Sequence, residues 1–105
     1  MQQQKILVCI IAMSGLTSPV IYADDAAAVY KSKCAICHGA DGSGNTPTGR
    51  SLKVRDLRSE EVQKMSSEEM EKIIAEGKGK MPAFKSKLAE ETIDSLVKWI
   101  KSLKK

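Results

Sequence analysis

The chain has 105 residues and a formal net charge of +4, with 29% charged and 42% hydrophobic residues. This length fits one small domain, and the composition excludes a disordered tail and a fibrous repeat. No apolar run reaches the ~18 residues of a confident membrane span, which excludes a polytopic membrane protein. Only 4% of the residues are aromatic. This small supply of large side chains indicates that a bound group fills part of the core.

Residues 1–23 are typical of a secretory signal peptide. Lys5 supplies the positive end, residues 6–13 form the apolar stretch, and a small residue ends the segment. We therefore expect residues 24–105 to form the mature domain of an exported, periplasmic bacterial protein. An uncleaved signal that anchors the domain on the periplasmic side is the alternative, because residues 6–23 are long enough to just cross a bilayer.

The mature sequence predicts helices and no strand, so the expected fold class is all-α. Helical patterns cover residues 25–35, a short stretch at 59–64, and residues 90–103, where apolar residues recur every three or four positions. Another helix is expected from a capping box at Ser66 and Glu69 to a stop at Gly77.

The segments between these helices are rich in turn-forming residues. Residues 39–49 hold four glycines and a proline, and we expect them to form a loop that wraps around something rather than a regular element. Residues 77–84 include two more glycines and Pro82, and are also expected to be irregular.

The pentapeptide Cys34-Ala-Ile-Cys37-His38 is the strongest functional signal in the chain. A C-x-x-C-H sequence is typical of haem c attachment, because two thiols on one helical turn reach both haem vinyl groups and the next imidazole lies under the iron. His38 is the only histidine, and it completes the motif. We therefore expect one covalently bound haem, attached through Cys34 and Cys37, with His38 as the proximal iron ligand.

Other interpretations of Cys34 and Cys37 are weaker. A redox pair needs a thioredoxin-like strand pattern nearby, which the sequence lacks. A zinc site needs four ligands, whereas the mature chain offers two cysteines and one histidine. A structural disulfide, as in a non-haem binding domain, is compatible with export, but a bridge that closes so short a loop stabilises little.

Methionine is the natural candidate for the sixth ligand, because a thioether favours ferrous iron and the chain has no second histidine. Met65 falls between two expected helices, and Met70 falls on an apolar stripe where core packing is its expected role. Met81 lies in the irregular loop, between glycines and Pro82. Such a loop can present a side chain to a metal at a fixed angle, so we expect Met81 to be the ligand.

With Met81-Pro82 in a late loop and an amphipathic last helix, the chain resembles class I cytochrome c, specifically the small bacterial monohaem proteins of the c6 and c551–c552 group. The resemblance covers the chain from Asp24 to its C-terminus. It implies three to four helices around one covalently attached haem, with the first and last helices crossing. Family members make this crossing with a small residue and an aromatic on one helix and an aliphatic–aromatic pair on the other. The matching residues here are Ala26 and Tyr30, and Leu96 and Trp99.

The resemblance also implies how the haem is surrounded. A backbone carbonyl accepts a hydrogen bond from the histidine Nδ1–H, and Pro47 is the proline placed to supply it. Haem propionates are held by basic or amide groups, for which Asn45, Arg50 and Lys53 are candidates. The side chains expected against the haem are Tyr30, Leu52, Val54, Leu57, Val62, Met70, Ile73, Ile74, Leu88, Ile93 and Val97.

The expected function is transfer of one electron at a time between redox proteins. With both axial positions filled, no open site exists for a small-molecule substrate, so we expect no enzymatic turnover. A haem-based sensor or peroxidase-like module, in which the sixth ligand leaves easily, is the alternative. The lysines beside Met81 indicate acidic docking surfaces on the partners: Lys78, Lys80, Lys85 and Lys87.

The remaining expectations concern other partners. The excess of basic over acidic residues is small and aromatic residues are few, so we expect no nucleic-acid partner. We expect a monomer that meets membranes only through partner complexes or an uncleaved signal.

Overall fold

The computed structural model describes residues 23–104, and within this range it has six helices and no β-strand. The predicted signal segment, 1–23, lies outside the described residues except for its last position. No helix within the described range is long and apolar enough to cross a bilayer. The helices are α1 (Ala23–Lys33), α2 (Ala35–His38), α3 (Pro47–Leu52), α4 (Glu60–Gln63), α5 (Ser67–Glu76) and α6 (Glu90–Lys101).

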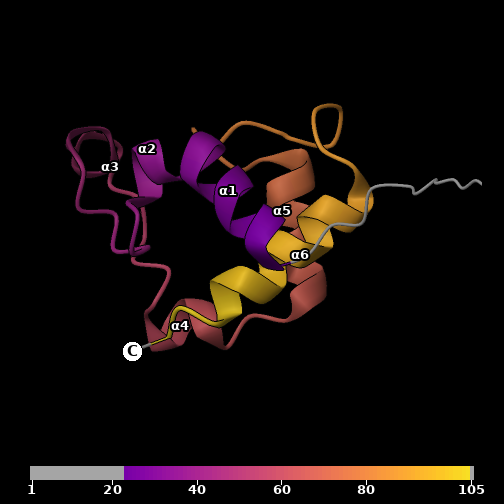
Figure 1. Cartoon of the computed structure of the whole chain (residues 1–105). Coiled ribbons are helices and arrows are strands. Elements are labelled where there is room, and N and C mark those ends of the chain that lie inside the picture. The colour runs from indigo at the N-terminus through magenta and orange to yellow at the C-terminus, as the bar shows by residue number, and fades with distance from the viewer. Residues whose placement is uncertain (1–22, 105) are drawn as a thin grey trace, which may run out of the picture.

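Helices α1 and α6 cross and pack against each other, with α5 beside α6 (Figure 1). At the crossing, Ala26 and Leu96 are completely buried. The rings of Tyr30 and Trp99 stack nearby, with their centroids 4.3 Å apart. The expected all-α fold with crossing terminal helices is therefore confirmed, and so is the expected contact of Tyr30 with Trp99.

The ends of α5 follow the local signals in the sequence. The Ser66 hydroxyl accepts a hydrogen bond from the Glu69 backbone N–H at 3.1 Å, and the Ser66 N–H donates to Glu69 Oε1 at 3.0 Å. Gly77 ends the helix at a positive φ of 78°, which glycine adopts without the penalty of a Cβ. Both predicted ends of this helix are confirmed.

Two short helices, α2 and α3, differ from the expected elements. The first predicted helix is split, because α1 ends at Lys33 and α2 begins at Ala35. The expected loop 39–49 is wrong over its last residues, since α3 begins at Pro47. The Thr46 side chain caps α3 by accepting a hydrogen bond from Gly49 N–H at 2.8 Å. Helices this short contain too few turns for an apolar repeat to appear.

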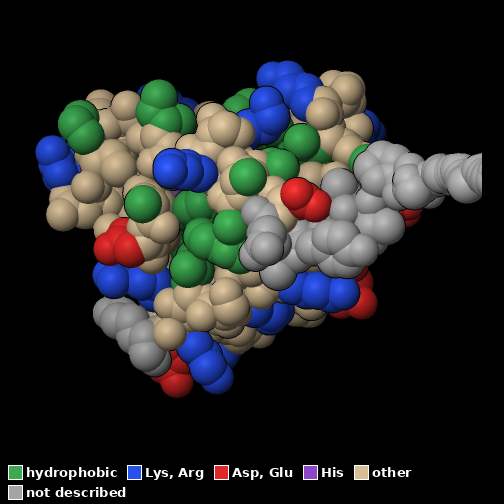
Figure 2. Space-filling view, viewed as in Figure 1, with side chains coloured by type: hydrophobic (Ala, Val, Ile, Leu, Met, Phe, Trp, Pro, Cys, Tyr) green, Lys and Arg blue, Asp and Glu red, His purple; other side chains and the backbone are tan. Residues whose placement is uncertain are grey.

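The core is built mainly from one side of the helices α1, α5 and α6. Figure 2 shows hydrophobic side chains also gathered on the surface, between the α2–α3 side and the α1–α6 side, with lysines and arginines around them. The buried hydrophobic residues are Ala26, Tyr30, Val62, Met70, Ile74, Phe84, Ile93, Leu96, Val97 and Ile100.

Candidate cofactor site

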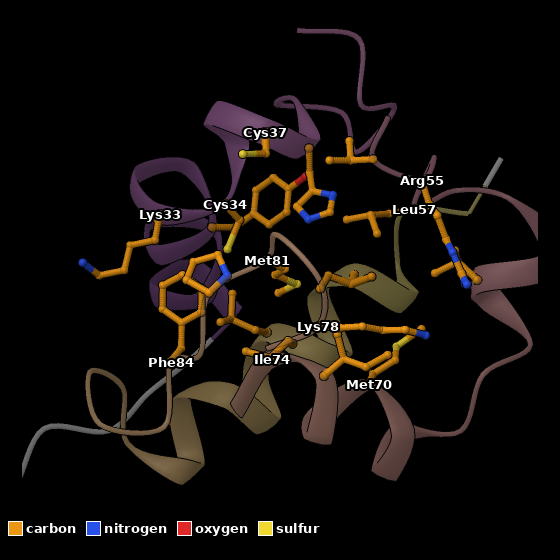
Figure 3. A pocket seen from close by; sticks show the side chains of 18 of the residues that line it. Lys33, Cys34, Cys37, Arg55, Leu57, Met70, Ile74, Lys78, Met81 and Phe84 are labelled. Carbon is orange, nitrogen blue, oxygen red and sulfur yellow. The ribbon is translucent and has the colours of Figure 1, made fainter. Parts of the chain in front are cut away.

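A cavity of about 470 Å³ opens into this core, bounded by α2, by the segment after α3, by α5 and by the loop that follows α5 (Figure 3). Cofactor sites in proteins are commonly about 300–1,000 Å³, with mostly apolar walls. The apolar walls here come from Leu52, Val54, Leu57, Val62, Met70, Ile73, Ile74, Phe84, Leu96 and Ile100.

Most of the expected pocket residues line this cavity, and Tyr30, Leu52 and Ile74 are among them. Leu88, Ile93 and Val97 do not, so the expectation was wrong for these three. On α6, the cavity is lined by Leu96 and Ile100, which share one edge of the apolar stripe. Ile93 and Val97 fall on the neighbouring edge of the stripe and are buried in the core.

Cys34 and Cys37 reach the cavity together because they belong to the same turn. The N–H groups of Cys37 and His38 both donate to the Cys34 carbonyl, at 3.2 and 2.9 Å. Both cysteines are free thiols that line the cavity, so the structure has no disulfide between them. Burial, with a further contribution from Cys37, raises the pKa of Cys34 to about 11, which keeps this sulfur protonated at neutral pH.

His38 ends α2 and lines the same cavity. Burial lowers the pKa of its imidazole, which favours the neutral form that binds metals. Its Nδ1 atom is buried and has no hydrogen-bond partner within the described part of the chain. A neutral imidazole that lines this cavity beside the two thiols fits the role of a metal ligand.

The expected hydrogen bond between His38 Nδ1 and the Pro47 carbonyl is not formed in this structure. Pro47 is exposed, does not line the cavity and is the first residue of α3. Carbonyls in a helix point along its axis toward the C-terminal end, so the Pro47 oxygen is directed into α3. The assignment of Pro47 as the carbonyl that orients His38 is therefore corrected.

Met81 reaches into the cavity from the loop that follows α5 (Figure 3). The loop is tight, because the backbones of Lys78 and Met81 exchange two hydrogen bonds, at 2.9 and 3.1 Å. A side chain at Gly77 would place its Cβ 2.6 Å from the Met81 carbonyl oxygen, so the turn requires glycine there. Met65 and Met70 also line the cavity, so the structure brings the side chains of all three methionines to one space.

Basic side chains surround the apolar walls. Of the three propionate candidates, only Lys53 lines the cavity, while Arg50 Nη1 donates to Asn45 Oδ1 at 2.6 Å. Arg55 also lines the cavity, and the sequence reasoning missed it. The sequence signal for Arg55 was the alternation of the basic residues Lys53 and Arg55 on either side of the apolar Val54. The basic residues that line the cavity are Lys33, Lys53, Arg55, Lys78 and Lys80.

Ile36 stands out at the same place. It lies between the two cysteines of the motif, lines the cavity and is 69% exposed. No other large hydrophobic residue is exposed within the part of the chain that the structure describes. The cavity is therefore an apolar space that holds two thiols, an imidazole and three thioethers, with an exposed apolar side chain and several cations around it.

Comparison with known proteins agrees with this site. A family model described as "Cytochrome C oxidase, cbb3-type, subunit III" matches residues 22–100. The chain is 33% identical over 86 residues to cytochrome c6 of Nostoc sp. (strain PCC 7120 / SAG 25.82 / UTEX 2576), which covers 80% of this chain and 75% of the relative. It is 35% identical over 79 residues to cytochrome c6 of Leptolyngbya boryana, which covers 72% of this chain and 89% of the relative.

A solved structure agrees as well. The c-type cytochrome KustC0563 superposes with a TM-score of 0.71 at 35% sequence identity, covering 76% of this chain and 98% of that chain. Together with the apolar cavity and its thiols, imidazole and thioethers, these likenesses identify the chain as a member of the cytochrome c family, a small class I cytochrome with one covalently bound haem c.

Proposed function

We propose that this haem electron carrier binds its iron between His38 and Met81 and passes single electrons between redox proteins, with thioether bonds from Cys34 and Cys37 holding the haem. The observation that supports this most directly is that all four side chains line one apolar cavity. When bound, the haem supplies the one-electron chemistry of its iron.

The protein's own contribution is to hold the two axial groups in place. His38 is set by the single turn of α2, whose bonds to the Cys34 carbonyl also place the two cysteine sulfurs. Met81 is set by the Lys78–Met81 turn. With His38 and Met81 both bound to the iron, no position would remain there for a substrate, so the protein would carry electrons without catalytic turnover.

Met81 is proposed over the other two methionines because of where each side chain is held. Met70 belongs to α5 and is 5% exposed, within the buried core. Met65 directly precedes the Ser66 cap of α5 and, like Met81, packs against the core. Met81 lies on an irregular loop that folds tightly on itself, because Gly77 and Gly79 adopt positive φ and a Cβ at Gly77 would meet the Met81 carbonyl oxygen. A thioether at the iron favours the ferrous state and so raises the reduction potential.

The basic residues at the cavity have two proposed roles. Lys53 and Arg55 would contact the haem carboxylates, because they follow α3 and reach the cavity from one segment. Exposed Ile36, together with Lys78 and Lys80, which line the same cavity, would meet a redox partner whose docking surface is acidic. We also propose that the protein acts as a monomer in the periplasm after removal of residues 1–23.

The test is production of the full chain in a host that attaches haem c, followed by a denaturing gel stained for haem. The wild-type chain should keep its stain, and the Cys34→Ala, Cys37→Ala double variant should lose it. Cys9→Ala is the matched control and should keep the stain, because this cysteine precedes the proposed cleavage site. A colourless wild-type protein from such a host would contradict covalent haem attachment.

A carbon monoxide titration of the reduced protein separates electron carriage from the sensor or peroxidase-like alternative. With Met81 bound firmly, carbon monoxide should bind slowly and incompletely at neutral pH. Rapid, stoichiometric binding would instead support a labile sixth ligand and the alternative function.

A further inference from the structure

The C-terminal end of α6 is hydrogen-bonded to the segment 57–65, far away in the sequence. Lys101 Nζ donates to the Met65 carbonyl oxygen at 2.6 Å and, at the longer distance of 3.4 Å, to the Gln63 carbonyl oxygen. The Gln63 side chain completes the connection, since its Nε2 donates to the carbonyl oxygens of Leu57 at 2.7 Å and Ile100 at 3.1 Å.

The segment that these bonds hold is one wall of the haem cavity. Leu57, Val62 and Met65 all line the cavity, and so does Ile100 on α6. Lys101 and Gln63 do not line it, so they act from behind this wall. We call the Leu57–Met65 segment the α4 wall.

Lys101 brings a positive charge to this position. Its side chain is half-buried, and no carboxylate forms an ion pair with it among residues 23–104. The groups that accept its hydrogen bonds are backbone carbonyls, which are dipoles and do not cancel a full charge. Because it is half-buried, salt screens this charge less than it screens the charge of an exposed lysine.

We propose that Lys101 sets the haem's reduction potential from behind the α4 wall, and that Gln63 and Lys101 together keep this wall closed over the haem. The inference rests on the proposed function as a haem electron carrier. Oxidation adds one positive charge at the iron, which a nearby cation opposes, so Lys101 stabilises the ferrous state and raises the potential. A closed wall acts in the same direction, because it excludes the water that would stabilise the ferric charge.

The experiment compares the reduction potentials of holoprotein variants. Lys101→Met removes the ammonium from a side chain of similar length and should lower the potential at both low and high salt. Lys104→Met is the matched control, since Lys104 is an exposed lysine just beyond α6. Its potential should stay at the wild-type value. Lys101→Arg keeps the charge and should retain most of the wild-type potential.

Gln63→Leu tests the wall without changing any charge. Hydrogen exchange at the backbone amides of the α4 wall should become faster than in wild type, and the potential should fall less than in Lys101→Met. Lys101→Gln retains a neutral hydrogen-bond donor at the same position. It should lower the potential, as Lys101→Met does. If Lys101→Met folds poorly, Lys101→Gln alone tests the effect of the charge.

A purely structural role would give a different pattern. Faster hydrogen exchange in Lys101→Met and Lys101→Gln, with potentials equal to that of Lys104→Met, would overturn the proposal. Failure of the proposed function is visible separately, as a wild-type protein without attached haem or without a reversible potential. The potentials are therefore compared only in protein whose haem content matches the wild type.

Discussion

The rings of Tyr30 and Trp99 lie 4.3 Å apart between centroids, tilted by 38°, where α1 crosses α6. Tyr30 is 1% exposed, lines the haem cavity, and donates its hydroxyl hydrogen to the Gly39 carbonyl oxygen at 2.7 Å. Gly39 directly follows His38. One side chain thus connects the packing of the terminal helices to the residue that follows the proposed iron ligand.

Tyr30→Phe is expected to lower the free energy of unfolding by about 1 kcal/mol, because it removes one of the two hydrogen bonds that the buried Gly39 carbonyl accepts and leaves only that from Gly42 N–H at 3.1 Å, while keeping the stacked ring. Burial raises the pKa of Tyr30 well above its usual range, so its hydroxyl remains a donor at all pH values of interest. Denaturant unfolding of the holoprotein measures the loss. Tyr30→Leu also removes the stacking on Trp99 and should cost about 1 kcal/mol more. Equal stability of wild type and Tyr30→Phe would mean that the hydrogen bond contributes nothing.

Gly49→Ala is expected to prevent normal haem incorporation. A Cβ at this position would overlap the carbonyl oxygens of Cys37 and Gly44, and backbone atoms cannot move aside cheaply. The change would therefore push α3 away from the attachment motif. The yield of haem-stained protein should fall severely.

Gly79→Ala is the matched control for this prediction. A Cβ at Gly79 would meet no atom within 4 Å, although the φ of +59° at this position disfavours alanine. It should therefore cost only about 1 kcal/mol of stability and leave haem content unchanged. Similar haem yields from the two variants would show that close approach at Gly49 is unimportant.

The sequence was sufficient to predict the long elements and the attachment motif, because their signals are local. The apolar stripe of α6 and the capping box of Ser66 and Glu69 depend on residues a few positions apart, and both are confirmed. The C-x-x-C-H motif likewise places Cys34, Cys37 and His38 within one turn, and the structure brings all three to the cavity.

The features that the sequence reasoning missed depend on contacts between distant segments. Arg55 lines the cavity from the segment that follows α3, and the first three residues of α3 were expected to belong to a loop. The bonds from Lys101 to Met65 and Gln63 join residues 36 and 38 positions apart, a separation at which no periodic pattern operates. The assignment of Pro47 failed for the same reason, because the direction of its carbonyl depends on a helix that local signals did not predict.

The interaction of Glu71 on α5 with Asp94 on α6 raises the pKa of Glu71 and so gives the fold a pH dependence. A hydrogen bond with Asp94 is the largest cause that raises the pKa of Glu71, followed by burial and by the charges of Asp94 and Glu68. The folded protein therefore holds a proton on Glu71 at a pH where the unfolded chain has released it. The resulting contribution to the free energy of unfolding is fully present below the ordinary pKa of 4.5, and it is lost as the pH rises through the raised pKa of Glu71.

Glu71→Gln should accordingly be more stable than wild type at neutral pH, where the Glu71 and Asp94 carboxylates of wild type repel each other. Mild acidification should stabilise this variant less than it stabilises wild type. Thermal unfolding at neutral and mildly acidic pH measures both effects. Glu76→Gln on the same helix is the control, because Glu76 is an exposed residue in the last turn of α5, away from this carboxyl pair. A stability profile of Glu71→Gln parallel to that of wild type would exclude this origin of the pH dependence.

Met81→Ala should remove the long-wavelength sulfur-to-iron absorption of the ferric protein and lower its reduction potential, because the proposed thioether ligand is lost. Met65→Ala provides the comparison, since Met65 lines the same cavity. It should keep the absorption band. Loss of the band in Met65→Ala and its retention in Met81→Ala would reverse the ligand assignment.

The lysines that flank Met81 in the sequence divide into two pairs in the structure. Lys78 and Lys80 line the cavity, whereas Lys85 and Lys87 do not, and the Lys87 ammonium lies over the Phe84 ring, 5.6 Å from its centroid. If an acidic partner docks at the exposed haem edge, the first pair should steer its approach and the second pair should contribute little.

Replacing Lys78 and Lys80 by Gln should therefore reduce the second-order rate of electron transfer with an acidic redox protein by about tenfold at low salt, and flatten the fall of this rate as salt is added. Replacing Lys85 and Lys87 by Gln removes the same formal charge from the same loop. Its smaller effect would separate local steering from the influence of net charge. Equal losses in the two double variants would mean that only net charge matters. Added salt screens exposed charges more than about 10 Å apart, so electrostatic steering must weaken as salt rises. A wild-type rate that does not change with salt would therefore exclude electrostatic steering.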